Sequence, residues 1–243
     1  MIKTKLVLFG TKKLMYYKGL LIRADYGLHE QIAEIIREKL PNGGRILDLG
    51  CGQGALSLRL HDMGYQVHAV DIDPADFKCG DIVSFEQLDF NNESAVTAFI
   101  GRHRDSFDLV IGIEVIEHIE NPWEYIRGLK CLTKKGGLIL ISTPNTTSWY
   151  SRLRFLFTGK FHQFREEDLS YGHISPITPY HLKLILEFEK LQDISIYSAG
   201  LLPPFWIQKS WNLLFLNMLN IFFYPFMKGI KNGWCIIATA RKT

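Results

Sequence analysis

Short apolar runs alternate with amphipathic stretches from residue 28 to the end of the chain. Short apolar runs bounded by turn residues are typical of buried strands, whereas apolar residues spaced three and four apart are typical of helices. These patterns predict strands at residues 45–49, 66–70, 81–88, 107–113, 136–142, 193–197 and 234–240. They predict helices at residues 28–40, 55–63, 92–101, 122–132 and 180–187.

Strands and helices that alternate in this way predict an α/β fold, with a seven-stranded, mostly parallel sheet and helices on both faces. A chain of 243 residues fits one domain with an insertion. Its expected parts are an N-terminal arm and helix, a ligand-binding core, a lid, and a hydrophobic lid insertion before the last strand. They correspond to residues 1–40, 41–145, 146–176 and 201–228.

A glycine-rich loop follows the first strand of the predicted sheet. Gly50, Gly52 and Gly54 precede a predicted helix, and glycine lets the backbone turn tightly and approach a ligand closely. Asp71 ends the next predicted strand, 21 residues after Gly50. A carboxylate about 20 residues beyond a strand–loop–helix unit can accept both ribose hydroxyls of a nucleoside. The pattern therefore favours a nucleoside site over a purely structural turn.

The spacing of these glycines indicates which nucleoside is bound. The loop reads G-x-G-x-G with Asp48 before it, whereas dinucleotide-binding folds use G-x-G-x-x-G. The string LDLGCGQG closely resembles the first motif of class I S-adenosylmethionine-dependent methyltransferases. The resemblance continues in VDIDP, LDF, FDLV and GGLILIS, which begin at residues 70, 88, 107 and 136. It is strong over residues 27–145 and looser elsewhere, and it implies a Rossmann-like class I methyltransferase fold.

The resemblance implies S-adenosyl-L-methionine as the cofactor and makes residues 41–145 its binding core. Asp71 would hold the ribose, while Asp89 and Phe90 would contact the adenine. The full set of cofactor-binding residues that it implies is Asp48, Gly50, Cys51, Gly52, Gly54, Asp71, Ile72, Asp89, Phe90 and Glu114. Residues 74–80 leave room for only one or two helical turns where the family usually has a full helix, so one pocket wall should be short.

Three residues with metal-binding side chains follow the fourth predicted strand, where the family presents groups to its substrate. If Glu114 begins a helical turn, Glu117 and His118 lie on its face at i+3 and i+4, so the three can converge. The pattern resembles ubiquinone-pathway O-methyltransferases and small-RNA 3′-terminal 2′-O-methyltransferases, two metal-assisted branches. It implies Mg²⁺ or Mn²⁺ at Glu114, Glu117 and His118. In the RNA branch a later histidine completes the set, which here would be His173 or His162.

An interpretation without a metal ion explains the same residues. Many class I members carry Glu-His here to orient the loop or to act as a base, and an imidazole pKa near 6.5 suits neutral pH. The catalytic candidates are therefore His118, Glu117 and His173. The run from Glu117 to Pro176 also resembles bacterial methyltransferases associated with glycan and lipid-linked metabolites. That resemblance implies O-methylation of a hydroxyl on a small-molecule, glycan or lipid-linked acceptor.

The 201–228 insertion has no charged residue between Lys209 and Lys228 and is dominated by large apolar side chains. A membrane-spanning helix needs about 20 predominantly apolar residues, and this segment contains three asparagines and Pro225. It therefore predicts a buried lid, a homodimer contact or a helix on a membrane surface. The lid at 146–176 mixes aromatic and basic residues, which suit either a planar or anionic substrate or simple packing.

Composition narrows the partners and the compartment. The 28 basic and 25 acidic residues leave a net charge of +3, so nucleic acid is a weak expectation and an RNA 2′-O-methyltransferase is the alternative. A non-catalytic cofactor-binding subunit is a second alternative, disfavoured by the complete loop and the Glu114–His118 cluster. Four scattered cysteines and a short N-terminal apolar run predict a cytoplasmic enzyme, peripheral on the inner membrane face if the insertion binds there.

Overall fold

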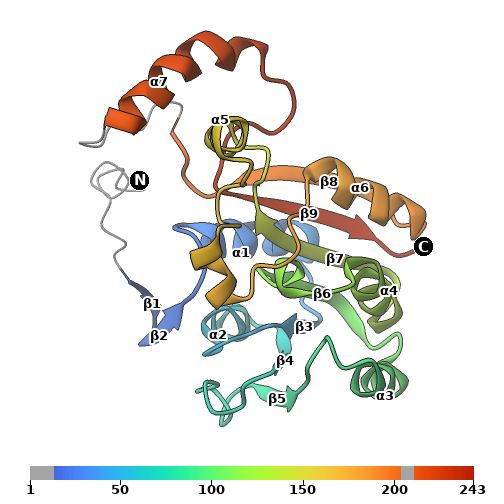
Figure 1. Cartoon of the computed structure of the whole chain (residues 1–243). Coiled ribbons are helices and arrows are strands. Elements are labelled where there is room, and N and C mark those ends of the chain that lie inside the picture. Colours follow the sequence, from blue (N-terminus) through green and yellow to red (C-terminus); the bar gives the residue numbers. More distant parts are fainter. Residues whose placement is uncertain (1–13, 204–210) are drawn as a thin grey trace.

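A seven-stranded sheet forms the centre of the molecule (Figure 1), and the computed structural model describes residues 14–203 and 211–243. The strand order is β5-β4-β3-β6-β7-β9-β8. In chain order the strands are β3 (Arg45–Leu49), β4 (Gln66–Asp71), β5 (Ser84–Gln87), β6 (Phe107–Ile113), β7 (Thr133–Pro144), β8 (Gln192–Ala199) and β9 (Cys235–Arg241). Only the pairs that β9 makes with β7 and β8 are antiparallel. The predicted α/β fold with a mostly parallel sheet is confirmed.

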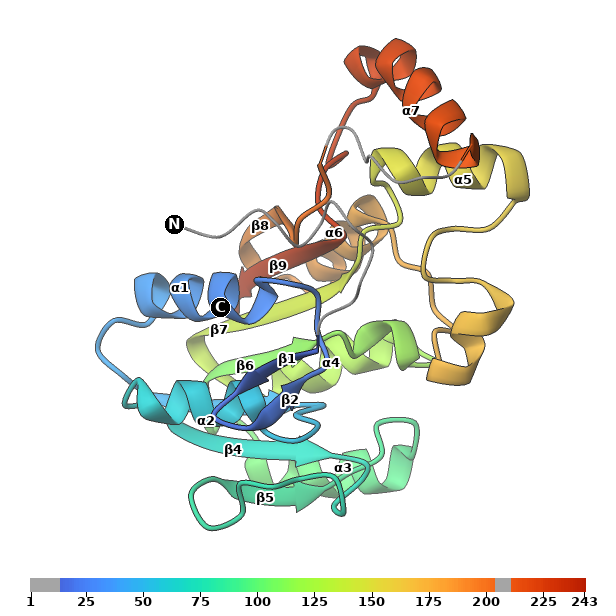
Figure 2. The same cartoon turned by 90° about the vertical axis from the view of Figure 1, so that its left-hand side faces the viewer.

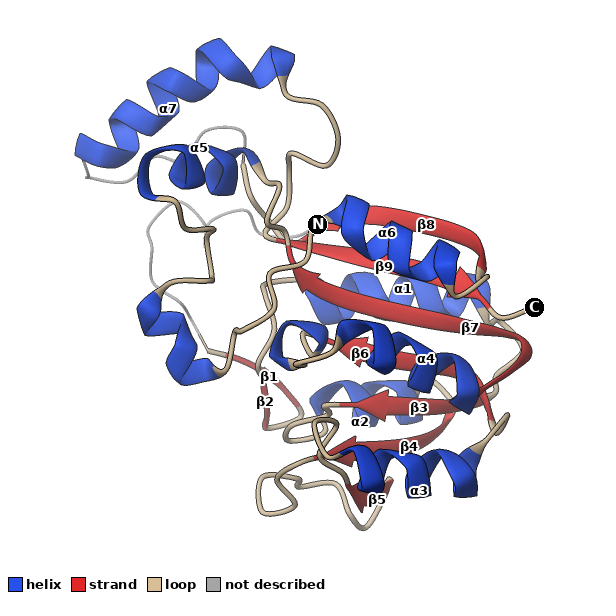
Figure 3. Ribbon diagram, turned by 45° about the vertical axis from the view of Figure 1, so that its right-hand side comes forward, coloured by secondary structure: helices blue, strands red, loops and turns tan. Residues whose placement is uncertain are grey.

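Helices cover both faces of the sheet (Figure 3). On one face α1 (Leu28–Lys39) and α2 (Ala55–Asp62) pack against one apolar cluster. On the other, α3 (Glu93–His103), α4 (Pro122–Leu132) and α6 (Pro179–Phe188) pack against a second. Because β3 and β6 are buried on both faces, their sequences are mostly apolar rather than strictly alternating.

Local signals in the sequence set the helix boundaries closely. At the start of α4, the Asn121 side chain accepts hydrogen bonds from the N–H groups of Trp123 and Glu124, both at 3.2 Å. Pro122 occupies the first helical turn, where its missing N–H costs nothing. The helix runs from Pro122 to Leu132 as predicted, and β3 and β6 also match their predicted bounds.

The region between β4 and β5 departs from the prediction. β5 has four residues instead of the predicted eight, because a turn at residues 79–83 takes up the start of the run. In that turn the N–H groups of Ile82 and Val83 both donate to the Cys79 carbonyl at 2.9 Å. Residues 74–80 form turns and loop rather than the one or two helical turns expected. This wall of the cleft is therefore built from loop.

The N-terminal arm contains a hairpin that the sequence did not predict. β1 (Met15–Tyr17) and β2 (Leu20–Ile22) pair antiparallel and lie beside α2 (Figure 2). The Leu21 N–H donates to Gln53 Oε1 at 2.9 Å, and Arg23 pairs with Asp76 at 2.8 Å. The hairpin is thereby fastened to the glycine loop. Residues 1–13, the rest of the arm, lie outside the described residues.

Two helices and two short 3-10 turns form a cap beyond the carboxyl ends of the parallel strands (Figure 3). The cap consists of α5 (Trp149–Thr158), η3 (Glu166–Tyr171), α7 (Trp211–Phe223) and η4 (Tyr224–Phe226). A third apolar cluster joins α5 to α7, with Trp149 and Leu153 at its centre and Leu216 packed against them. Among the described residues, no helix combines the length and apolarity required to cross a membrane.

Candidate active site

The glycine loop between β3 and α2 leaves one face of its backbone open. Gly50, Gly52 and Gly54 have φ angles of 73°, 52° and 87°, a region that favours glycine. A Cβ on Gly50 would lie 2.4 Å from Val115 Cγ2, so the loop packs tightly there. A Cβ on Gly52 would find its nearest neighbour, Asp76 Oδ2, at 3.9 Å. The Gly52 backbone therefore faces space that a ligand can enter.

Asp71 stands at the end of β4, directly beside this open backbone. Its Oδ2 accepts the Gly52 N–H at 2.7 Å, and its Oδ1 accepts the Asp73 N–H at 3.1 Å. Each carboxylate oxygen has two lone pairs, so each retains one for a ribose hydroxyl. The loop and carboxylate thus form a cradle that fits the nucleoside of S-adenosylmethionine.

Asp48 and Cys51 support the loop from behind. Asp48 is buried in β3 and accepts a 2.5 Å hydrogen bond from Ser57 Oγ, which ties the strand to α2. Burial raises the pKa of Asp48 to about 7, while the Ser57 hydrogen bond opposes that shift. Cys51 is also buried, and burial raises the pKa of its thiol. Both residues stabilise the loop's shape.

The residues expected at the adenine lie at the ends of β4 and β5. Ile72 is exposed immediately after Asp71, and the Leu88 N–H donates to the Asp71 carbonyl at 3.0 Å. Asp89 Oδ1 accepts the Asn91 N–H at 2.9 Å. The Phe90 ring meets Tyr125 edge-on at 5.5 Å. The Leu88 bond places residues 88–90 beside the end of β4, where an adenine contact is expected.

Glu114 follows β6 in a left-handed conformation with a φ of 55°. Its Oε1 accepts the Ser142 hydroxyl at 2.7 Å, and Cys235 Sγ lies 3.4 Å from its Oε2, so it is held to β7 and β9. Burial raises its pKa to about 7. The expected helical turn from Glu114 is wrong, because η2 begins at Ile116 and spans Ile116–His118. Glu114 therefore does not lie on one helical face with Glu117 and His118.

His173 takes the place beside Glu117 and His118. A carboxylate oxygen and one nitrogen from each ring all lie within 4.8 Å of one another. The His118 and His173 rings meet at 4.9 Å with an interplanar angle of 74°. The Glu117 carbonyl accepts the N–H groups of Ile174 at 3.0 Å and Ser175 at 2.9 Å. These two backbone bonds bring the distant 172–176 segment against η2.

Burial shifts the Glu117 and His118 side chains toward their uncharged forms. It raises the pKa of Glu117 well above its usual value, and the nearby Glu114 adds to the shift. The Thr143 hydroxyl is close enough to oppose it, but neither Glu117 carboxyl oxygen has a well-formed hydrogen bond among the described residues. Burial and the neighbouring His173 lower the pKa of His118.

The tautomer of His173 follows from its partner. His173 Nδ1 lies 2.7 Å from the Gln163 carbonyl oxygen, which can only accept, so Nδ1 carries a proton, and in the neutral tautomer the lone pair is on Nε2. The lowered pKa of His118 favours its neutral ring, so the cluster offers imidazole nitrogens that can take a proton or bind a cation. The chemistry of this donor set fits a divalent ion as well as general-base catalysis.

His162 and Asn145 occupy supporting positions instead. The His162 ring packs against Tyr150 at 5.1 Å and Trp234 at 4.8 Å in the cap, so His173 is the later histidine that joins the cluster. Asn145 directly follows β7. It is buried, and its Nδ2 donates to the carbonyls of residues 230, 232 and 233. Asn145 thus fixes the approach to β9.

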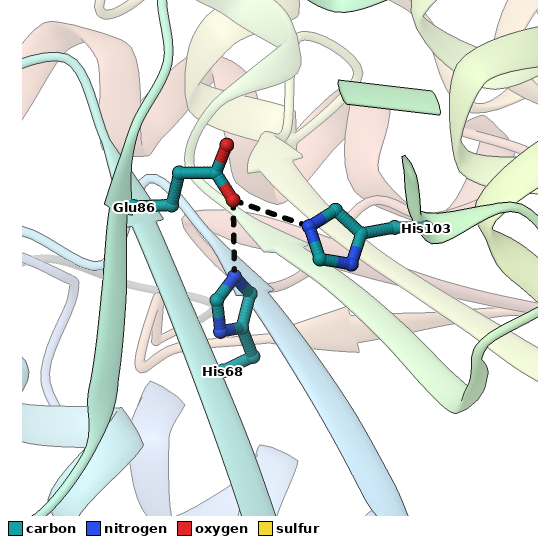
Figure 4. A group of neighbouring side chains, drawn as sticks. All are labelled: His68, Glu86 and His103. Carbon is teal, nitrogen blue, oxygen red and sulfur yellow. Dashed lines mark hydrogen bonds and ion pairs between the residues drawn. The ribbon is translucent and has the colours of Figure 1, made fainter. Parts of the chain in front are cut away.

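A second group of potential metal ligands lies outside the cleft (Figure 4). His68, Glu86 and His103 come from β4, β5 and α3, and Glu86 Oε2 is 3.7 Å from His68 Nε2 and 3.1 Å from His103 Nε2. Arg102 pairs with the other Glu86 oxygen. The His68 ring stacks against Phe99 at 6.4 Å. We assign this group, which the sequence did not predict, to the packing of α3 on the sheet.

Comparison with known proteins identifies the family. A family model described as a methyltransferase domain matches residues 23–193, which is most of the chain. The chain belongs to this methyltransferase family. It is a class I S-adenosylmethionine-dependent methyltransferase, and the predicted enzyme class and cofactor are confirmed. The cradle at Gly52 and Asp71 is where the structure can hold that cofactor.

Curated relatives match over less than half of the chain. The ubiquinone biosynthesis O-methyltransferase of Xanthomonas axonopodis pv. citri (strain 306) is 38% identical over 110 residues, covering 44% of this chain and 46% of the relative. That of Xanthomonas campestris pv. campestris (strain B100) is 39% identical over 114 residues, covering 46% and 47%. The matches thus span about half the length of these relatives.

Solved structures share the fold over nearly the whole chain. A SAM-dependent methyltransferase from Archaeoglobus fulgidus aligns with a TM-score of 0.59 and 20% identity, covering 88% of this chain and 94% of that one. Phosphoethanolamine N-methyltransferase 2 from Haemonchus contortus, in complex with S-adenosyl-L-methionine, aligns with a TM-score of 0.56 and 17% identity, covering 91% and 54%. At these identities the likeness establishes the fold alone.

Proposed function

We propose that this enzyme methylates a hydroxyl group of a small-molecule, glycan or lipid-linked acceptor. The observation that carries the proposal is the Glu117–His118–His173 cluster, which follows the carboxyl end of β6 next to the strand that carries the glycine loop. Ligands of open α/β sheets bind beyond the carboxyl ends of the strands. The curated relatives named O-methyltransferases support the same reaction type.

A hydroxyl acceptor needs a base, because removal of its proton makes the oxygen a stronger nucleophile. The cofactor supplies a methyl group on a sulfonium, so the methyl carbon–sulfur bond breaks as the oxygen–carbon bond forms. His118 accepts the hydroxyl proton, because burial and His173 keep its imidazole neutral. His173 presents a second imidazole ring beside it, and Glu117 holds the 172–176 segment in place through its backbone carbonyl.

A metal-assisted form of the reaction is the second candidate. Glu117, His118 and His173 provide a carboxylate and two imidazoles, a set that binds Mn²⁺ and related cations. A bound cation would favour the ionised Glu117 carboxylate and would supply a Lewis acid for the acceptor oxygen. An RNA ribose hydroxyl would be an acceptor of that kind, although the apolar cap and the net charge of +3 favour a smaller or lipid-linked molecule.

Transfer of a ¹³C-labelled methyl group tests the proposal. The enzyme would be incubated with methyl-labelled S-adenosylmethionine and matched acceptor pairs, phenols and anilines that bear the same apolar chain. We expect the label to appear as an O-methyl carbon in the phenol products. Label found only on nitrogen or carbon across the matched pairs would contradict the proposal.

A further inference from the structure

The helix α7 exposes its apolar face to solvent, whereas an ordinary surface helix buries that face against the core. Its outward face is apolar and exposed, with Trp211 86% and Phe222 67% accessible to solvent. Spacings of three and four place the members of this face in one stripe: Trp211, Leu214, Phe215, Met218, Ile221 and Phe222. The opposite, inward face carries Leu213 and Leu216 together with Asn217 and Asn220.

The exposed stripe continues onto the neighbouring elements of the cap. Phe155, Leu156 and Phe157 are exposed on α5, and Phe226 is exposed on η4. Between α5 and η4 lies an open groove of about 500 Å³ with walls mainly of leucine, phenylalanine and methionine. Arg152 and Lys228 also line it. A contiguous exposed apolar surface of this kind marks a binding face, whereas apolar residues scattered singly over a surface are normal.

The charged residues of α5, α7 and η4 are all basic, and the acidic residues of the neighbouring η3 pair with Lys160 and Arg165. No aspartate or glutamate occurs in residues 143–165 or in residues 194–243, which supply α5, α7, η4 and β9. The same stretches carry Arg154 in α5 and the exposed Lys228 after η4. An apolar face bordered by basic residues and lacking acids is complementary to a bilayer that contains anionic lipids.

We propose that the α5–α7 face docks this enzyme on an anionic lipid bilayer. The apolar stripe of α7 enters the boundary between headgroups and acyl chains, with Trp211 at the level of the headgroups. Arg154 and Lys228 contact lipid phosphates, and the groove accommodates part of a lipid chain. The helix lies on the bilayer rather than across it, in keeping with its 13 residues.

Docking in this orientation turns the active-site edge of the sheet toward the membrane. The cap lies beyond the carboxyl ends of the strands (Figure 3), and α5 follows directly on the end of β7. A lipid-linked acceptor could then reach the cleft without leaving the bilayer. Docking is nevertheless separate from the methyl-transfer proposal, because it depends on α5 and α7 and not on the Glu117–His118–His173 cluster.

Vesicle flotation of the full-length enzyme tests docking without any measurement of turnover. We expect co-flotation with phosphatidylcholine vesicles that contain phosphatidylglycerol, and at least tenfold weaker binding to phosphatidylcholine alone. Phe215→Ser/Phe222→Ser should weaken binding at least tenfold. Arg154→Glu/Lys228→Glu should remove the preference for anionic lipid. Binding of S-adenosylhomocysteine should stay at the wild-type level in both variants, which shows that they fold.

Matched controls come from α6, where Tyr180, Lys183 and Phe188 are also exposed. Tyr180→Ser/Phe188→Ser and Lys183→Glu should float like the wild type. The proposal is overturned if the wild type fails to float with anionic vesicles, or if the α6 variants lose as much binding as the α7 variants. It is also overturned if the wild type is a dimer by light scattering that Phe215→Ser/Phe222→Ser converts to a monomer with unchanged vesicle binding.

Discussion

The backbone N–H of Gly52 donates to Asp71 Oδ2 across 2.7 Å, which links the glycine loop to the carboxylate that we expect to bind the ribose. The loop belongs to the β3–α2 connection, and the carboxylate belongs to the end of β4. One hydrogen bond therefore fixes the relative position of the two halves of the cofactor site before any ligand arrives. Such preorganisation reduces the ordering cost of binding.

Replacing Asp71 should remove most of the affinity for the cofactor. Asp71→Ala deletes two acceptors for ribose hydroxyls, each worth up to about 1.5–3 kcal/mol, so we expect at least roughly 100-fold weaker binding of S-adenosylhomocysteine. Asp73→Ala is the control, because among the described residues the Asp73 side chain accepts a hydrogen bond only from the nearby Ala75 N–H. Calorimetric titration measures both. Equal affinities for the two variants would contradict the placement of the ribose at Asp71.

A methyl group at Gly52 should block the cleft without undoing the fold. Gly52→Ala and Gly64→Ala both place alanine at a positive φ, which costs about 1–2 kcal/mol of stability, and neither new Cβ meets an atom closer than 3.9 Å. Only Gly52 borders the proposed cofactor space. We therefore expect similar losses of unfolding free energy but a loss of cofactor affinity, more than tenfold, in Gly52→Ala alone. Equal affinities would place the cofactor elsewhere.

Buried His29 in α1 should make the fold sensitive to acid. Burial and the charge of Arg59 lower its pKa from 6.5 to about 4, so the unfolded chain binds this proton more readily than the folded one. The contribution of neutral His29 to the free energy of unfolding is therefore fully present above pH 6.5. It falls as the pH drops toward 4 and is about 2 kcal/mol smaller at pH 5. In urea titrations, the free energy of unfolding should fall between pH 7 and pH 5 by about 2 kcal/mol less in His29→Leu than in the wild type. An unchanged pH dependence would contradict this role.

A substitution at Glu117 distinguishes the metal-free form of the reaction from the metal-assisted form. The side-chain amide of the Glu117→Gln variant would imitate the neutral carboxyl that burial favours but would bind a cation poorly. In the metal-free form the variant should keep most of its turnover, and chelator should have no effect on the wild type. In the metal-assisted form the variant should lose turnover, and Mn²⁺ or Mg²⁺ should restore the chelated wild type. Cofactor affinity should stay unchanged in every case, because the nucleoside is held at Asp71.

The sequence predicts those parts of this fold that local signals determine. The runs of β3 and β6 are buried on both faces, and Asn121 and Pro122 mark the start of α4, so their bounds match the prediction. Residues 81–83 were assigned to a strand because their apolar residues resemble one, yet backbone bonds to the Cys79 carbonyl turn the chain. Periodicity cannot reveal such a competition between turn and strand.

The composition of the Glu117–His118–His173 cluster depends on tertiary contacts. The prediction of a helical turn from Glu114 failed because Ser142 and Cys235 hold that side chain against the sheet. His173 reaches His118 only because the Glu117 carbonyl binds the backbone of residues 174 and 175. The sequence suggested either His162 or His173, and nothing short of the folded chain could choose between them.

The most direct test of the account is the single-turnover rate of His118→Ala with a hydroxyl acceptor, measured together with its affinity for S-adenosylmethionine. As proton acceptor, His118 should contribute about 10²–10⁴-fold to the rate, with cofactor affinity unchanged. His61→Ala, at an exposed position of α2, should retain the wild-type rate. A His118→Ala enzyme that transfers the methyl group at the wild-type rate would contradict the account.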